Sequence, residues 1–209
     1  MRDRAGILAY VAALGVAAVM DALVKLVVAR VGLAEILLWR SLGALLLLLP
    51  VLWLTGRLGR LRPVKPGFVA LRGLVLAGAT ALFFYGLGGL TLPVAYTITF
   101  TMPLMMAAMA AIALREPIGV RGIFAILLGF AGVLVALEVR PWALGDTAFG
   151  WHAAAALAAT FLYALALVAI RVADQAESTE ALVLGGMIAT ALLALGLLPG
   201  AGAGRAEGA

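Results

Sequence analysis

Seven long apolar runs dominate this 209-residue chain and constrain its fold more than any other feature. They cover residues 6–29, 32–54, 68–90, 91–114, 120–137, 149–171 and 181–198. Each is close to the roughly 20 residues that a helix needs to cross the hydrocarbon core of a bilayer. The runs do not alternate in polarity, and an open sheet edge cannot face lipid, so they predict helices and not strands. We therefore expect an all-α, polytopic membrane helix bundle with about seven transmembrane helices.

Charged residues are too few to cover a water-soluble domain of this size. They make up 12% of the chain, while 66% of its residues are hydrophobic. Soluble domains carry about a quarter charged residues, so most side chains here must be surrounded by the lipid bilayer or by other apolar helices. The formal net charge is +5, and most of the basic residues that produce it lie in short loops between the runs. This placement indicates the orientation of the chain in the membrane and not nucleic-acid binding.

Lysine and arginine residues gather on one side of the predicted membrane. With a cytoplasmic N-terminus, the inner side holds Arg2, Arg4, Arg57, Arg60, Arg62, Lys65, Arg72, Arg115, Arg121 and Arg171. The outer side then holds Arg30, Arg140 and Arg205. This bias predicts a multi-pass protein of the inner (plasma) membrane, with its N-terminus inside and its C-terminus outside.

Several classes of chemistry are excluded by the residues that the sequence lacks. The chain has no cysteine and one histidine, which rules out thiolate and multi-histidine metal sites. It also has no nucleophile–histidine–acid set and no phosphate-binding loop in a strand–helix context. We therefore expect no enzymatic activity, no cofactor and no ATP-driven transport.

Ionisable side chains inside the apolar runs mark a first candidate site, because each is costly in lipid unless it is paired or hydrated. Asp21 and Lys25 share one face of the first run, and Arg40 lies in the second. If the chain turns after Arg30, antiparallel helices place Asp21 and Arg40 at nearly the same depth. We predict an Asp21–Arg40 pair, with Lys25 and Glu35 as its outer neighbours. The pair is either a structural clamp or a substrate site, in which the planar guanidinium binds an anionic group.

The fourth run carries a second candidate site, a methionine-rich wall beside a proline. Thr99, Met102 and Met106 recur at helical spacing, and methionine side chains adapt to irregular ligands. Pro103 removes one backbone hydrogen bond and frees the carbonyl of Thr99, which cannot face lipid. The same pattern is also typical of ordinary helix packing. Three tyrosines complete the candidate substrate-binding residues, two beside this wall and one on the sixth run: Tyr85, Tyr96 and Tyr163.

Glycines and a short break predict how neighbouring helices meet. The sequence GGLTLP at residues 88–93 favours a tight hairpin between the third and fourth runs. Small residues let membrane helices approach closely, and we expect this role for Gly78, Gly86, Gly129 and Gly132.

Five segments, taken together and in order, resemble a known family. They are MDALVK (20–25), WRSLGA (39–44), ALFFYG (81–86), LREPI (114–118) and GFAGVL (129–134). They are similar to the EamA-type members of the drug/metabolite transporter superfamily, and most to the branch with S-adenosylmethionine and riboflavin-type carriers. The resemblance covers one five-helix unit, residues 6–138, and includes the recurrent arginine at Arg40. It implies a secondary transporter of a small organic metabolite that works by alternating access around a central cavity.

Members of this family usually contain two such units in inverted orientation. Here residues 149–198 resemble the first two helices of a second unit, and residues 199–209 form a low-complexity tail. We expect the chain to act either as a homodimer or with a partner that supplies further helices. The alternatives are a truncated, transport-inactive relative and a membrane scaffold subunit.

Overall fold

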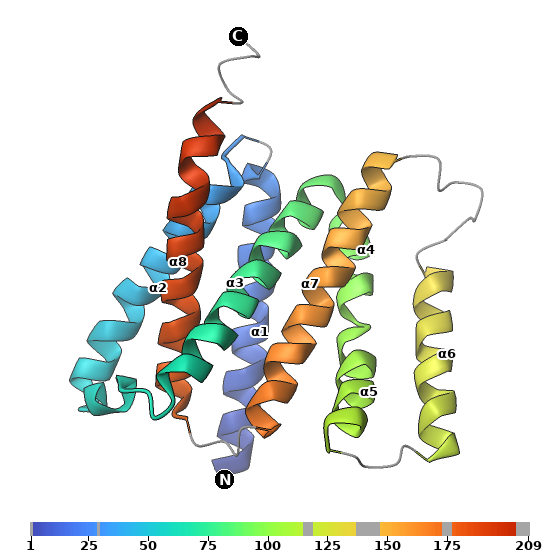
Figure 1. Ribbon diagram of the computed structural model, residues 1–209, viewed down its shortest axis with the longest axis horizontal. Coiled ribbons are helices and arrows are strands. Elements are labelled where there is room, and N and C mark those ends of the chain that lie inside the picture. Colours follow the sequence, from blue (N-terminus) through green and yellow to red (C-terminus); the bar gives the residue numbers. More distant parts are fainter. Residues whose placement is uncertain (1, 29, 115–118, 137–146, 173–176, 204–209) are drawn as a thin grey trace.

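A computed structural model of the protein describes residues 2–28, 30–114, 119–136, 147–172 and 177–203, and within these residues the regular structure is helical. The long helices are α1 (Arg2–Val27), α2 (Leu33–Leu54), α3 (Pro66–Gly89), α6 (Val120–Ala136), α7 (Thr147–Val172) and α8 (Thr179–Ala203). Two shorter helices share the fourth run, α4 (Leu92–Thr99) and α5 (Met102–Leu114), and a 3₁₀ turn, η1 (Leu58–Leu61), follows α2. The helices lie roughly along one direction, and the chain passes up and down the bundle (Figure 1). The predicted all-α membrane bundle is therefore confirmed.

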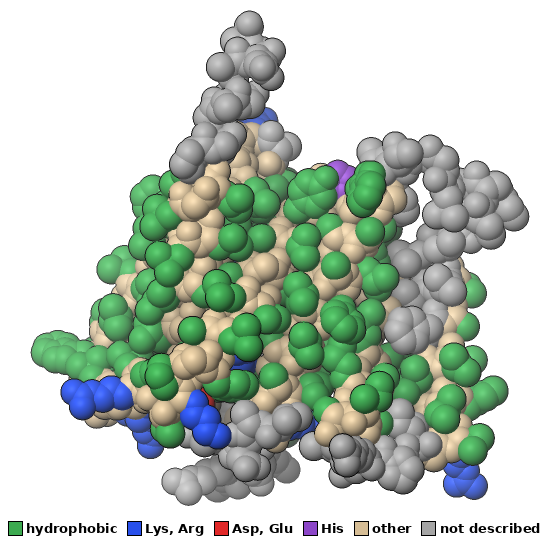
Figure 2. All heavy atoms as spheres, viewed as in Figure 1, with side chains coloured by type: hydrophobic (Ala, Val, Ile, Leu, Met, Phe, Trp, Pro, Cys, Tyr) green, Lys and Arg blue, Asp and Glu red, His purple; other side chains and the backbone are tan. Residues whose placement is uncertain are grey.

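Six of the seven predicted spans are long and apolar enough to cross a bilayer. They are Gly6–Val27, Leu33–Leu54, Pro66–Gly89, Leu92–Ala113, Gly150–Arg171 and Thr179–Leu198. The remaining one, α6, is a 17-residue apolar helix, and Leu137, at the end of its predicted span, lies outside the described residues. Figure 2 shows a broad hydrophobic surface, with basic side chains gathered mainly at the end where the N-terminus lies, called here the lower end.

Helix α3 lies at the centre of the bundle, where it packs against both α7 and α8. Glycine residues of α3 permit the close approach of these two helices. A Cβ atom at Gly73 would lie 2.7 Å from the carbonyl oxygen of Gly185, and one at Gly86 would lie 2.9 Å from the carbonyl oxygen of His152.

Two of the four glycines expected to permit close packing, Gly86 and Gly129, have close neighbours. The expectation is wrong for Gly78 and Gly132, since a Cβ atom there would meet nothing within 4 Å.

The turn from α3 to α4 occupies the predicted hairpin position. Helix α3 ends at Gly89, and α4 begins at Leu92 with a proline in its first turn. The last carbonyls of a helix have no partner within it, and Lys25 from α1 donates to two of them. Its Nζ lies 2.7 Å from the oxygen of Leu87 and 3.3 Å from that of Gly88. A lysine at this end also complements the helix dipole.

The fourth span is broken, and Pro103 accounts for the break. Helix α4 ends at Thr99 and α5 begins at Met102. Proline cannot donate the hydrogen bond that would continue the helix. The hydroxyl of Thr101 donates to the oxygen of Ile98 at 2.7 Å, while its carbonyl accepts from Leu104 and Met105. The buried Thr101 therefore ends one helix and begins the next.

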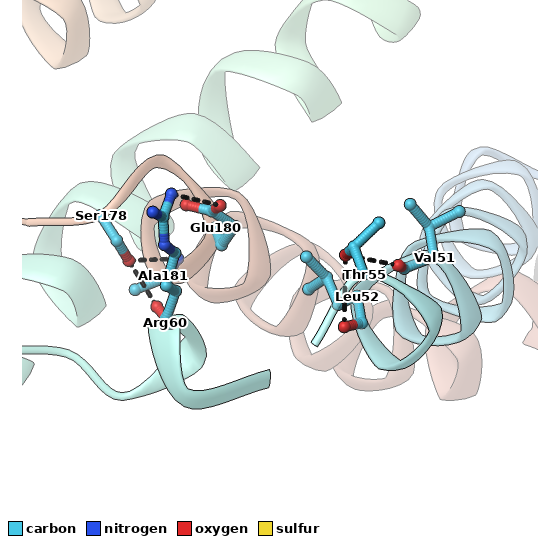
Figure 3. Close-up of polar contacts among 7 residues, drawn as sticks. All are labelled: Val51, Leu52, Thr55, Arg60, Ser178, Glu180 and Ala181. Carbon is cyan, nitrogen blue, oxygen red and sulfur yellow. Dashed lines mark hydrogen bonds and ion pairs between the residues drawn. The ribbon is translucent and has the colours of Figure 1, made fainter. Parts of the chain in front are cut away.

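The loop between α2 and α3 is fastened to the start of α8 at the lower end (Figure 3). Arg60 pairs with Glu180 at 3.4 Å, and Ser178 donates to the carbonyl of Arg60. Ser178 also caps α8, because its hydroxyl accepts from the N–H of Ala181 at 3.1 Å. The carboxylate of Glu177 accepts backbone N–H groups from Val64, at 2.9 Å, and Lys65. These contacts hold the lower ends of α3 and α8 together.

Candidate substrate cavity

A cavity of about 1110 Å³ lies among α1, α2, α3, α7 and α8. Its walls reach from Val31, in the turn between α1 and α2, to Glu177 and Thr179 before and at the start of α8. Most of the lining is apolar, with Leu, Val, Ile and Met side chains from all five helices. Ligand sites commonly have volumes of about 300–1,000 Å³ and mostly apolar walls with a few polar groups. The cavity therefore has room for a small organic molecule.

Arg40 of α2 lines this cavity. Its guanidinium carbon lies 5.5 Å from the ring centroid of Phe84, a fully buried side chain of α3. An arginine at this distance from an aromatic ring makes a cation–π contact, which stabilises the charge beside apolar surroundings. The guanidinium has no carboxylate partner among the described residues. Its planar N–H groups can therefore bind an anionic group of a ligand.

A pair of hydroxyl groups faces the cavity from α3 and α7. The Tyr163 and Thr80 oxygens lie 2.9 Å apart, and the Thr80 hydroxyl also lies 2.8 Å from the Leu76 carbonyl. Because Thr80 gives its one hydrogen to Leu76, Tyr163 must donate to Thr80. Ser41 and Thr190 likewise donate to carbonyls of their own helices, at 2.8 Å each. The hydroxyls of this wall therefore offer their oxygens as hydrogen-bond acceptors.

Asp21 and Tyr96 meet beside the cavity. The Tyr96 hydroxyl donates to Oδ2 of Asp21 at 2.8 Å and so joins α1 to α4. Arg40 lies near enough for its charge to act on the Asp21 carboxylate, but the two residues form no direct ion pair among the described residues. The predicted direct pair is therefore wrong, because Tyr96 is the hydrogen-bond partner of Asp21. Lys25, expected as an outer neighbour, lies one turn beyond Asp21 on α1 and caps α3.

Five predicted binding residues lie away from the cavity lining. Tyr85 is half exposed and stacks on His152 with ring centroids 4.7 Å apart. Thr99 donates to the Ala95 carbonyl of its own helix at 3.0 Å. The other three, Met102, Pro103 and Met106, belong to α5, which packs against α6 and α7. The structure thus brings together Arg40 and Tyr163 in the cavity, with Asp21 and Tyr96 beside them.

Sequence reasoning missed six polar residues of the lining: Ser41, Arg72, Thr80, Glu177, Thr179 and Thr190. Arg72 was counted only as a cytoplasmic charge that sets the orientation. A signal was present, because Arg72 lies inside the predicted span 68–90, and a charge within such a span is a candidate functional residue. No comparable signal marks Thr190, since hydroxyls in membrane helices commonly bond to the preceding turn.

The arrangement defines a class of protein: a multi-pass helical membrane protein with a partly open cavity among its helices, which carries a few polar groups. Within that class its family is established. The EamA-like transporter family matches residues 4–137, well over half of the chain, and the chain belongs to that family. No curated protein and no solved structure matches the chain. Members of the EamA-like family are transporters and not enzymes, so the cavity is the natural candidate for the substrate site.

Proposed function

We propose that the protein is a secondary transporter that moves a small organic metabolite across the inner membrane by alternating access. The observation that carries this proposal is the cavity, which holds Arg40 and the Thr80–Tyr163 pair between aliphatic walls. Family membership supports transport as the activity. In this proposal Arg40 binds an anionic group of the substrate, and the hydroxyl oxygens accept hydrogen bonds from its polar groups.

The proposed orientation places the N-terminus and the lower end of the bundle in the cytoplasm. The described basic residues near that end are Arg57, Arg60, Arg62, Lys65, Arg121 and Arg171, whereas Arg30 lies in the turn at the upper end. Cytoplasmic loops carry an excess of lysine and arginine, so this distribution favours an N-in topology.

We further propose that α7 and α8 are the first two helices of an inverted second unit. In Figure 1 α7 runs opposite to α1, and α8 runs opposite to α2. The equivalent helices α2 and α8 also pack against each other. Further helices, from a second copy or a partner, would cover α1, whose most apolar stretch has no residue buried inside the bundle.

Uptake into proteoliposomes tests the transport proposal. Radiolabelled riboflavin 5′-phosphate and S-adenosylmethionine are suitable probes, because each resembles the molecules carried by the branch to which the sequence is most similar and each bears an anionic group. We expect saturable uptake of at least one probe and a loss of about tenfold or more in Arg40→Gln, since a charged, bidentate contact disappears. Arg121→Gln is the matched control, because Arg121 is exposed on α6 and does not line the cavity. Correctly folded protein without uptake of either probe would favour an inactive relative or a scaffold.

A further inference from the structure

Arg72 places a second positive charge in the cavity, near its lower end. It lies on α3, six residues after Pro66, so its Cα is about 9 Å above the start of the helix. Its Nε donates to the carbonyl of Ala166 on α7 at 3.1 Å. This bond fixes the guanidinium between the two helices, and its remaining N–H groups are available to the cavity that it lines.

The acidic groups that the structure describes near the cavity form no ion pair with Arg72. Asp21 accepts the hydroxyl of Tyr96, and Glu177 accepts the backbone N–H groups of Val64 and Lys65. Among the described residues, neither Arg40 nor Arg72 has a carboxylate within 4.0 Å. Within the part of the chain that the structure describes, the lining therefore combines two arginines that form no ion pair with a mainly aliphatic wall.

We propose that Arg72 is a second anion-binding residue of the cavity and that the substrate is a small organic anion. Its carboxylate, sulfonate or phosphate group is bound by Arg72 at the lower end and by Arg40 higher in the cavity. Its apolar body lies against the aliphatic side chains of α1 and α8. An unpaired cation in apolar surroundings is costly, and binding of an anion lowers that cost. This inference rests on the proposed transport function and narrows its substrate class.

A single cysteine in the cavity measures the local electrostatic potential without knowledge of the substrate. The natural sequence has no cysteine, so Val183→Cys gives one labelling site on α8, in the lining. The protein is purified in neutral detergent and labelled with two methanethiosulfonate reagents, one bearing a sulfonate and the other a trimethylammonium group. The ratio of the sulfonate rate to the ammonium rate reports the potential at residue 183.

Arg72→Gln should lower the ratio of the sulfonate rate to the ammonium rate roughly fivefold. This is the effect of losing one charge about 10 Å from the labelled cysteine in partly screened surroundings. Arg72→Lys keeps the charge and should keep most of the ratio, which separates a charge effect from a folding defect. Arg121→Gln removes an equal charge from outside the cavity and should leave the ratio unchanged. An unchanged ratio in Arg72→Gln would overturn the proposal.

The same measurement separates this inference from the transport proposal. If neither reagent reaches residue 183, the cavity is closed to water and both proposals fail. If both reagents react but Arg72 does not affect their ratio, only the anion-binding role fails.

Lipid headgroups also carry phosphate, so the experiment is repeated in nanodiscs of phosphatidylcholine with and without phosphatidylglycerol. An effect of Arg72→Gln that persists in both supports a soluble organic anion. An effect that disappears with phosphatidylglycerol would mean that Arg72 binds lipid phosphate, and the proposal would be overturned.

Discussion

Helices α1 and α3 are both long and apolar, but they are held in the bundle in different ways. Helix α3 packs against α7 and α8 through glycines, and 33% of its most apolar stretch is buried, compared with none of the corresponding stretch of α1. Helix α1 is joined to its neighbours by polar side chains, through Asp21 to Tyr96 and through Lys25 to the end of α3.

The two kinds of contact respond differently when a helix shifts or gains an atom. Close backbone packing depends on the shape of both helices and fails when one atom is added. A polar contact from a long side chain tolerates shifts in position, because the side chain can follow its partner. Helix α3 therefore acts as the fixed centre of the bundle, whereas α1, which forms one wall of the cavity, is held by a few hydrogen bonds and by partly buried side chains such as Met20 and Val24.

The largest effect is expected where a glycine of α3 gains a methyl group. In Gly86→Ala the new Cβ would lie 2.9 Å from the backbone oxygen of His152 and 3.2 Å from the Cβ of Ala156. Neither neighbour can move easily, so we expect a loss of about 1–3 kcal/mol in the free energy of unfolding. Equilibrium unfolding in mixed micelles measures this free energy. Gly78→Ala is the control on the same helix, because its Cβ would meet nothing within 4 Å. Equal losses in both variants would contradict the packing role.

A medium effect is expected at Lys25, the polar link between α1 and α3. A Cβ atom at Gly88 would lie 4.0 Å from Val28 Cγ2, so the double variant Val28→Cys, Gly88→Cys should form a disulfide readily. Adding Lys25→Met removes a charged hydrogen bond worth about 1.5–3 kcal/mol and should slow cross-linking several-fold. Gel mobility without reductant follows the reaction. The pair Val28→Cys, Gly78→Cys should not cross-link. A rate independent of Lys25 would show that other contacts hold α1.

The smallest effect is expected at the bond between Tyr96 and Asp21. Tyr96→Phe removes the donor, and we expect a loss of about 1 kcal/mol in unfolding free energy. A double-mutant cycle with Asp21→Asn isolates the interaction between the two side chains. Tyr85→Phe serves as the control, because the Tyr85 hydroxyl makes none of the hydrogen bonds found among the described residues. Additive losses in the cycle would rule out a direct contribution of this bond.

The helices were largely predictable because hydrophobic length is a local property of the sequence. Six predicted runs correspond to membrane-length helices, and the GGLTLP hairpin lies where expected. The break at Thr101 was only half foreseen: Pro103 indicated the lost hydrogen bond, but the sequence does not say whether a helix bends or divides.

The cavity was predictable only where a polar residue stood out from an apolar run, as Arg40 and Tyr163 do. Counting residues from a turn gives the depth of a side chain but not the direction in which it points. For that reason Asp21 and Arg40 were expected to pair, whereas Tyr96, which is 75 residues away in the sequence, donates to Asp21. The methionines of α5 do not line this cavity, and a uniformly apolar helix gives no sign of which neighbour it faces, so their binding role stays a prediction.

The contact between Gly73 and Gly185 has a mechanical consequence. The two backbones touch there without intervening side chains, so the contact can serve as a fulcrum between α3 and α8. It divides α3 unequally, with about 10 Å of helix below Gly73 and about 24 Å above it. A tilt of about 10° around this point would move the upper end of α3 by about 4 Å and the lower end by less than half as much. Because Gly86 packs against α7 above this point, such a tilt would have to carry α7 with it.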